Sequence, residues 1–192
     1  MNDKSKLQNE LEKFVPFNEQ EEADKRLFLT CLSKGEEIFF RENKEAHISA
    51  SGWLVNQTRD KVLMAYHNIY QSWAWTGGHA DGEKDLLSVA IREAKEETGI
   101  KTVKPVIEEI FSIEVLTVDG HEKNGSYVSS HLHLNVTYLL EGDERELIRS
   151  KEDENSKVGW IPIEDCLLVV NEPWMKERIY QKLLKKMDIL KI

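Results

Sequence analysis

The sequence predicts an α+β fold, a layered α/β sandwich with a mixed β-sheet and a helical extension at the N-terminus. Strand-like stretches of alternating polar and apolar residues occupy the middle of the chain. A helix with one apolar and one acidic face interrupts them, and helical patterns lie at both ends. The length of 192 residues suits a single domain with an extension, because such a chain buries about 70 % of its unfolded surface.

The first part of the chain predicts helices. Residues 5–34 are polar with apolar residues near helical spacing, and Pro16 separates them into two helices. Asn18 is a suitable N-cap for the second helix, with Glu21 three residues later. We therefore predict a helical N-terminal extension over residues 1–46 and a single domain over residues 47–192.

The strands of the domain over residues 47–192 begin with a predicted hairpin. Two alternating stretches flank a polar turn, which is typical of paired antiparallel strands. Residues 68–82 are expected to form a loop, and the region from Pro173 onward is expected to form an amphipathic helix. The predicted strands cover residues 47–55, 61–66, 110–118, 131–140 and 158–161.

The central helix is predicted over residues 85–98, and Gly99 can adopt the left-handed conformation that ends a helix. Glu93, Glu96 and Glu97 are spaced three and four residues apart, so they share one surface patch. Like charges at these spacings destabilise a helix by about 0.2–0.5 kcal/mol per pair. A bound divalent cation would reverse this penalty. A glycine-rich loop lies just before the helix, next to this acidic patch.

Composition excludes several classes of protein. The net charge of −9 argues against binding to a nucleic-acid polymer, because no basic run offsets it. Cys31 and Cys166 are far apart and form no CxxC motif, which argues against a disulfide framework and a zinc-thiolate site. The charged N-terminus and the absence of an apolar run approaching about 18 residues argue against secretion and membrane insertion. We expect a cytoplasmic protein.

The glycine loop and the central helix together carry a resemblance to a known family. Residues from Gly78 to Ile100 resemble the Nudix box, a glycine followed after five residues by Glu and after seven more by Arg-Glu-U-x-Glu-Glu-x-Gly-U, with U apolar. The second half matches at every fixed position from Arg92 onward. One position departs from the box: Lys84 stands where the family has glutamate, and Glu83 lies one residue early. Glu83 is therefore expected to brace the loop, with its pairing to Arg92 in question.

The resemblance extends beyond the box, over about residues 47–170. Trp75-Thr76-Gly77-Gly78-His79 resembles the strand end that enters the box, and Glu154 stands six residues before Trp160, much like the acidic residue and the tryptophan of a later strand in the family. The family implies a Nudix-like α/β/α sandwich. It also implies that a Mg²⁺ ion, with Mn²⁺ as an alternative, is bound by Glu93, Glu96, Glu97 and a backbone carbonyl near Gly77 or Gly78.

The resemblance also implies catalytic roles. Glu93 acts as a metal ligand, and either Glu97 or Glu154 takes the proton of the attacking water. Arg92 either orients the carboxylates or contacts substrate, and His79 either contacts phosphate or caps the loop.

Aromatic and polar residues outside the box allow two interpretations each. Trp75, like Trp53, Tyr70 and Trp73, can stack on a nucleobase or belong to the core, and strand aromatics favour the core. The residues His131, His133, Asn135 and Thr137 alternate along one strand and share a polar face. That face could line the cleft. Two histidines at this spacing can also bind a metal, although a polar sheet face is the simpler interpretation.

The function that follows from the resemblance is a Nudix-type pyrophosphohydrolase. We expect it to cleave a diphosphate linkage in a small-molecule nucleoside diphosphate derivative. One alternative is a non-catalytic Nudix-fold module that binds a nucleotide as a sensor. The prenyl diphosphate isomerase branch of the fold is disfavoured, since it uses a cysteine near the glycine loop. The amphipathic segments at both ends of the chain could pack either on the domain or across a homodimer.

Overall fold

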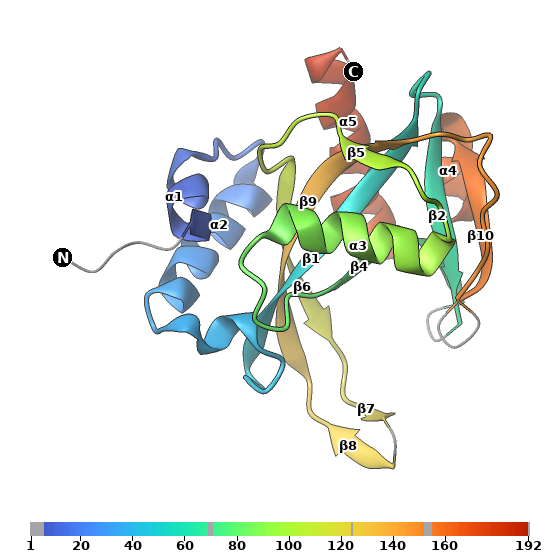
Figure 1. Cartoon of the computed structure of the whole chain (residues 1–192). Coiled ribbons are helices and arrows are strands. Elements are labelled where there is room, and N and C mark those ends of the chain that lie inside the picture. Colours follow the sequence, from blue (N-terminus) through green and yellow to red (C-terminus); the bar gives the residue numbers. More distant parts are fainter. Residues whose placement is uncertain (1–5, 69–70, 124, 152–154, 192) are drawn as a thin grey trace.

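A mixed eight-stranded sheet forms the centre of the molecule (Figure 1). The computed structural model describes residues 6–68, 71–123, 125–151 and 155–191. The strand order is β10-β2-β1-β9-β5, and β3, β4 and β6 pair with β2, β1 and β9 respectively. The long strands β1 and β9 run parallel, whereas the other pairs are antiparallel. The strands are β1 (Ala46–Asn56), β2 (Lys61–His67), β3 (Ser72–Ala74), β4 (Thr76–His79), β5 (Val103–Pro105), β6 (Ser112–Val118), β9 (His131–Gly142) and β10 (Asn155–Pro162), with β7 (His121–Lys123) and β8 (Ser126–Val128) in a separate hairpin.

Helices cover both faces of the sheet, so the predicted α/β/α sandwich is confirmed. One apolar core joins the sheet to α1 (Lys6–Lys13), α2 (Glu19–Leu32), the 3-10 turn η1 (Glu36–Phe39) and α3 (Leu86–Thr98). The second core joins the opposite face to α4 (Ile163–Val169), the π-helical segment η2 (Met175–Tyr180) and α5 (Gln181–Leu190). Side chains along β1 alternate between the two faces of the sheet. Ile48 and Leu54 therefore lie in the first core, whereas Trp53 lies in the second.

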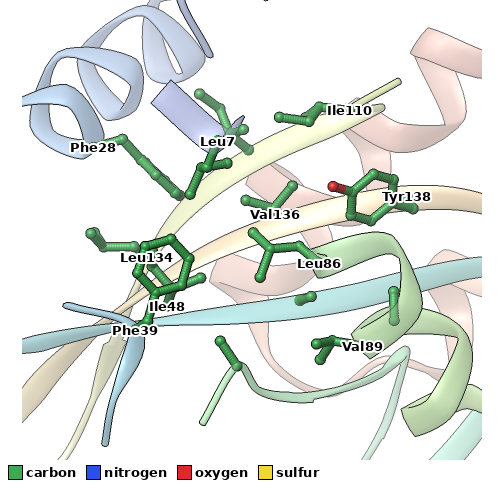
Figure 2. Close-up of a cluster of buried hydrophobic side chains, with 14 of the residues drawn as sticks. Leu7, Phe28, Phe39, Ile48, Leu86, Val89, Ile110, Leu134, Val136 and Tyr138 are labelled. Carbon is green, nitrogen blue, oxygen red and sulfur yellow. The ribbon is translucent and has the colours of Figure 1, made fainter. Parts of the chain in front are cut away.

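The N-terminal helices share their core with the sheet. Figure 2 shows Leu7 and Phe28 from α1 and α2 beside Leu134 and Val136 of β9. The same cluster includes Leu86 of α3. The helices of the extension therefore pack on the sheet, while the division of the chain at residue 46 stays a prediction.

Helix α2 begins at its predicted cap and covers an edge of the sheet. The Asn18 side chain accepts a hydrogen bond from the Glu21 amide at 3.0 Å. Farther along the helix, Asp24 Oδ2 accepts from the backbone N–H of Val115 at 3.1 Å. Val115 belongs to β6, so Asp24 occupies a backbone group that an open sheet edge would expose.

A network of buried charges joins α2, β6 and α5. Lys182 Nζ lies 2.9 Å from Glu114 Oε1, and Lys186 Nζ lies 2.8 Å from Glu21 Oε1. Ser112 donates to one of these carboxylates and contacts the other, at 2.7 Å for Glu21 and 2.5 Å for Glu114. Burial alone would raise the pKa of Glu21, but the charges of Lys182 and Lys186 hold it below its ordinary value.

Several local predictions need correction. Residues 68–82 were expected to form a loop, but the structure has β3 and β4 there, because both add to the antiparallel ladders of β2 and β1. The C-terminal amphipathic segment is divided into η2 and α5. The short elements β5 and α4 were not predicted. Both cysteines are buried free thiols. The helices of the described ranges lack the length and hydropathy of a membrane-spanning segment.

Candidate active site

The start of α3 is held by contacts that differ from those expected of the box. Glu83 Oε1 accepts hydrogen bonds from the backbone N–H groups of Lys84 and Asp85, at 2.8 and 2.9 Å. Glu83 thus braces the turn at the helix N-terminus, where a negative charge is favourable. The side chain of Lys84, at the departing box position, lies 2.5 Å from Glu36 of η1.

The N-terminal extension contacts the turn that leads into α3. Arg41 forms a bidentate ion pair with Asp81, and the backbone N–H of Gly82 donates to Phe39 O at 2.9 Å. Gly82 has a φ of +89°, and a Cβ there would overlap the Phe40 ring. The extension therefore fixes the conformation of the glycine turn.

Glu93 lies directly against the backbone of Gly78. A Cβ built on Gly78 would lie 2.6 and 2.8 Å from the two carboxylate oxygens of Glu93. Only glycine leaves room for this carboxylate, which explains why a glycine stands at this position. Arg92 Nη2 donates to Glu93 Oε1 at 2.9 Å, so Arg92 orients a carboxylate, as one of its two predicted roles requires.

Glu97 of α3 is held by Gly77, the residue of β4 that precedes Gly78. Its Oε1 accepts from the backbone N–H of Gly77 at 2.9 Å, and its Oε2 accepts from Asn155 Nδ2 at 3.3 Å. The residue is only 7 % exposed. Asn155 was missed from the sequence, and its Oδ1 is a buried atom without a hydrogen-bond partner.

Glu96 points elsewhere. Its side chain is 52 % exposed, and its Oε1 lies 3.9 Å from Arg92 Nε. It lines an open cleft of about 710 Å³ together with Ile148, Arg149, Ser150, Lys151, Lys157 and Val158. The structure therefore brings Glu93 and Glu97 to adjacent glycines of β4. It places Glu96 in the lining of a cleft with three cationic side chains.

The structure favours the core interpretation of the aromatic candidates. Trp75 meets the Tyr180 ring edge to face at 5.6 Å, and its backbone N–H donates to the Tyr180 hydroxyl at 3.2 Å. Trp53 is fully buried and stacks on the same ring. Tyr70 and Glu154, a predicted catalytic residue, lie outside the described residues.

The predicted polar face of β9 is half-buried at His131 and His133 and buried at Asn135 and Thr137. Asn135 accepts from Ser49 and Ser51 of β1, at 3.1 and 2.8 Å, and donates to Glu114 at 3.0 Å. Thr137 also donates to Glu114, at 2.7 Å. These groups satisfy one another in the interior, because the lysines of α5 cover this end of the face.

His79 lies on the other side of β4 from Glu93. A side chain at Gly77 would meet Ser51 of β1, whereas one at Gly78 would meet Glu93. Because side chains alternate along a strand, His79 shares the face of position 77, away from α3. Its ring lies 5.0 Å from that of His47 and 4.9 Å from that of His133.

Comparison with known proteins identifies the family. A family model described as the NUDIX domain matches residues 45–183, well over half of the chain. The chain belongs to the Nudix hydrolase family. The expected enzyme class, a Nudix-type pyrophosphohydrolase, is confirmed with it.

Three proteins similar to this Nudix hydrolase are 17–26 % identical to it. A protein of Lactococcus lactis named a probable DHNTP pyrophosphohydrolase is 26 % identical over 140 residues, 73 % of this chain and 80 % of that protein. A Nudix-family hydrolase from Clostridium perfringens has a similar fold, with a TM-score of 0.52, 23 % identity and coverage of 75 % of this chain and 97 % of its own. The Escherichia coli dihydroneopterin triphosphate pyrophosphohydrolase matches with a TM-score of 0.50, 17 % identity and coverage of 72 % and 95 %. The two structural matches show the shared fold alone.

Proposed function

We propose that this Nudix hydrolase is a Mg²⁺-dependent enzyme that cleaves a diphosphate linkage in a nucleoside diphosphate derivative. The observation that supports this best is the seating of Glu93 and Glu97 against the consecutive glycines of β4. These two carboxylates lie one helical turn apart on α3, and the backbone of the glycines adjoins them. A cluster of oxygen donors at a glycine turn fits a hard cation beside a phosphate group.

The donor set fits the proposed ion. The residues that would hold it are Glu93, Glu97 and the backbone carbonyl of Gly78, all of which offer oxygen. Glu96, whose exposed side chain points toward the neighbouring cleft, would join them by turning toward Glu93. Mg²⁺ prefers oxygen ligands, and Mn²⁺ accepts the same set. When bound, the ion would supply charge neutralisation at the phosphates and activation of a water molecule.

Groups of the protein itself hold the two carboxylates and accept the proton. Arg92 holds Glu93 in place through its 2.9 Å hydrogen bond. Gly77 N–H and Asn155 hold the two oxygens of Glu97. In the reaction, the oxygen of water bonds to one phosphorus, the bond from that phosphorus to the bridging oxygen breaks, and Glu97 or Glu154 accepts the proton of the water.

The cleft beside Glu96 supports an anionic substrate. Arg149, Lys151 and Lys157 line it, although the protein as a whole carries a net charge of −9. Such a local reversal of charge attracts phosphates that the rest of the surface repels. The name of the Lactococcus lactis relative adds a pterin triphosphate to the substrates worth testing.

Activity on a substrate panel tests this proposal. The purified chain is incubated with nucleotide sugars, dinucleotides, ADP-ribose, nucleoside triphosphates and a pterin triphosphate, each with Mg²⁺, with Mn²⁺ and with EDTA. We expect metal-dependent release of two phosphate-containing products from at least one nucleoside diphosphate derivative. Absence of turnover on every compound, combined with calorimetric binding of an unchanged nucleotide, would instead support the sensor alternative.

A Gly78→Ala variant tests the seat of Glu93. The added methyl group must displace the carboxylate, because it would lie 2.6 and 2.8 Å from its oxygens. We expect kcat/KM on the best substrate to fall about a hundredfold, the typical effect of shifting a catalytic group by about 1 Å. Gly159→Ala on β10 is the matched control, since its Cβ would make ordinary contact with Trp73 at 3.4 Å. Equal activity of the two variants would contradict the proposed role.

We also propose that the enzyme is cytoplasmic, and that it acts either as a monomer or as a homodimer. The acidic composition is compatible with free diffusion of small anionic substrates to a locally basic cleft. Gel filtration of the full chain distinguishes the two oligomeric states.

A further inference from the structure

Four of the six histidines of the chain gather at one end of the sheet. They are His47 of β1, His79 of β4, and His131 and His133 of β9. The topology explains this grouping. The starts of the parallel strands β1 and β9 lie together, with His47 opposite His133. Strand β4 runs antiparallel to β1, so its last residue, His79, reaches the same end, opposite Ser49.

The nitrogen atoms of this histidine cluster are close enough to share one ion. One ligand nitrogen from each of His47, His79 and His133 lies within 4.8 Å of the other two. Among the residues that the structure describes, no other group of three or more His, Cys, Asp or Glu side chains has its ligand atoms this close together. His131 Nε2 lies 3.3 Å from His133 Nε2, so a fourth imidazole adjoins the three.

Hydrogen bonds orient two of the rings with a lone pair toward the cluster. His47 Nδ1 lies 3.0 Å from Asn43 O, and His131 Nδ1 lies 2.8 Å from Ser129 O. A carbonyl only accepts, so each Nδ1 carries the proton and each Nε2 offers a lone pair. His47 Nε2 is buried and has no hydrogen-bond partner. Metal-binding histidines are typically oriented in this way, through a backbone carbonyl at the second nitrogen.

Burial also favours the neutral, metal-binding form of two of the rings, His47 and His133. Burial, and then the neighbouring histidines, lower the pKa of His133 to about 3. Burial lowers the pKa of His47 despite its hydrogen bond to Asn43. Arg41 contributes a repulsive charge at this place, but its guanidinium is paired with Asp81.

We propose that His47, His79 and His133, with His131 as a fourth ligand, form a site for a borderline divalent transition metal such as Zn²⁺. Zinc binds imidazole nitrogen at about 2.0–2.1 Å in tetrahedral sites, which places two such nitrogens about 3.3–3.4 Å apart. The 3.3 Å separation of His131 and His133 matches this spacing. Three atoms within 4.8 Å of one another have a common point within about 2.8 Å, so only small ring movements close the set on an ion.

This histidine site is separate from the acidic site of the Nudix box. Its ligands are nitrogen, which Mg²⁺ disfavours and Zn²⁺, Co²⁺ or Ni²⁺ accept. His79 lies on the face of β4 opposite Glu93, as the positions of Gly77 and Gly78 show. A metal bound here would join β1, β4 and β9 next to the glycines that seat Glu93 and Glu97, so it would stabilise that end of the sheet.

Metal titrations of the full chain test the histidine site. The protein is stripped with EDTA, and Zn²⁺ binding is measured by calorimetry, with Co²⁺ absorption as a report of coordination geometry. A Glu93→Gln/Glu97→Gln variant removes the acidic site from the measurement. We expect this variant to bind one Zn²⁺ per chain, with a tetrahedral Co²⁺ spectrum and a raised Tm in the presence of Zn²⁺.

Substitutions then assign the ligands. His133→Asn and, separately, His47→Gln should weaken Zn²⁺ binding at least about a hundredfold, because loss of even a hydrogen-bond partner of a ligand costs about 10–100-fold. The matched control is His121→Asn on β7, because His121 also has Nδ1 at a backbone carbonyl, Asp119 O at 2.9 Å. It should bind Zn²⁺ as the parent does. Should a buried variant fail to fold by circular dichroism, the partly exposed His131→Asn takes its place, with at least tenfold weaker binding and loss of the tetrahedral Co²⁺ spectrum expected.

Two results would overturn the histidine site. One is Zn²⁺ affinity that is unchanged in His133→Asn, His47→Gln and His131→Asn. The other is Zn²⁺ binding that disappears in the Glu93→Gln/Glu97→Gln variant, which would place the metal at the acidic site. Neither result depends on hydrolase activity, so the proposed function is tested independently.

Discussion

The Glu97→Gln variant should fold normally and hydrolyse its substrate about 10²–10⁴-fold more slowly, the usual contribution of a general acid–base group. The substitution keeps the shape of the side chain. Its amide oxygen can still accept from Gly77 N–H, which now holds Glu97 Oε1 at 2.9 Å. What is lost is the negative charge, and with it the ability to bind a cation and to take a proton from water.

Glu97→Gln is compared with two other glutamate variants, Glu22→Gln and Glu154→Gln. Glu22 lies on the exposed surface of α2, so Glu22→Gln should retain full activity. Glu154→Gln is assayed in parallel, because either Glu97 or Glu154 can serve as the base in the proposed mechanism. Steady-state kinetics with Mg²⁺ over a range of pH separate the two, since loss of the base removes the acidic limb of the rate profile. Unchanged turnover by Glu97→Gln would contradict the proposed site.

The parts of the site that could be predicted from the sequence depend on local geometry. The spacing of Glu93 and Glu97 places both on one side of a helix, and Gly99, with φ of +70°, ends that helix as expected. The glycine pair before the helix has a recognisable spacing from Arg92. For these features, neighbours along the chain are also neighbours in space, and short-range periodicity is sufficient.

The features that were not predicted depend on strand pairing between distant segments. Asn155 reaches Glu97 from the edge strand β10, 58 residues away in sequence. His47 meets His133 only because β1 and β9 run parallel in a particular register, and a one-residue shift would place either ring on the opposite face. The pair of His131 and His133 was a visible signal, but the partners from β1 and β4 were not.

The displaced glutamate of the box shows a similar limit. The motif predicts a bracing role for Glu83 but leaves its pairing with Arg92 open. In the structure, Glu83 accepts from the backbone of Lys84 and Asp85, while Lys84 pairs with Glu36 of the N-terminal extension. A segment that lies outside the matched family region, residues 45–183, thus provides the partner for the departing residue.

The buried charges beneath α5 predict the largest effect on stability. Lys182 is 3 % exposed, and its ammonium group lies 2.9 Å from Glu114 Oε1 and 3.4 Å from Glu21 Oε1. A Lys182→Met variant keeps much of the apolar stem but leaves Glu114 without its cation. Removing one partner of a buried ion pair typically costs about 3–5 kcal/mol, so we expect the free energy of unfolding to fall by that amount.

Urea unfolding of matched variants tests this prediction and separates its causes. Lys185→Met changes an exposed lysine of the same helix and should alter stability by no more than about 0.5 kcal/mol. Adding Glu114→Gln to Lys182→Met should restore part of the loss, because the remaining amide can still be hydrogen-bonded by its polar neighbours and no unpaired charge stays buried. A loss from Lys182→Met no larger than that from Lys185→Met would contradict the predicted contribution of the buried ion pair. A large loss that Glu114→Gln partly reverses would show that the charge, rather than the packing of the stem, joins α5 to β6 and, through Glu21, to α2.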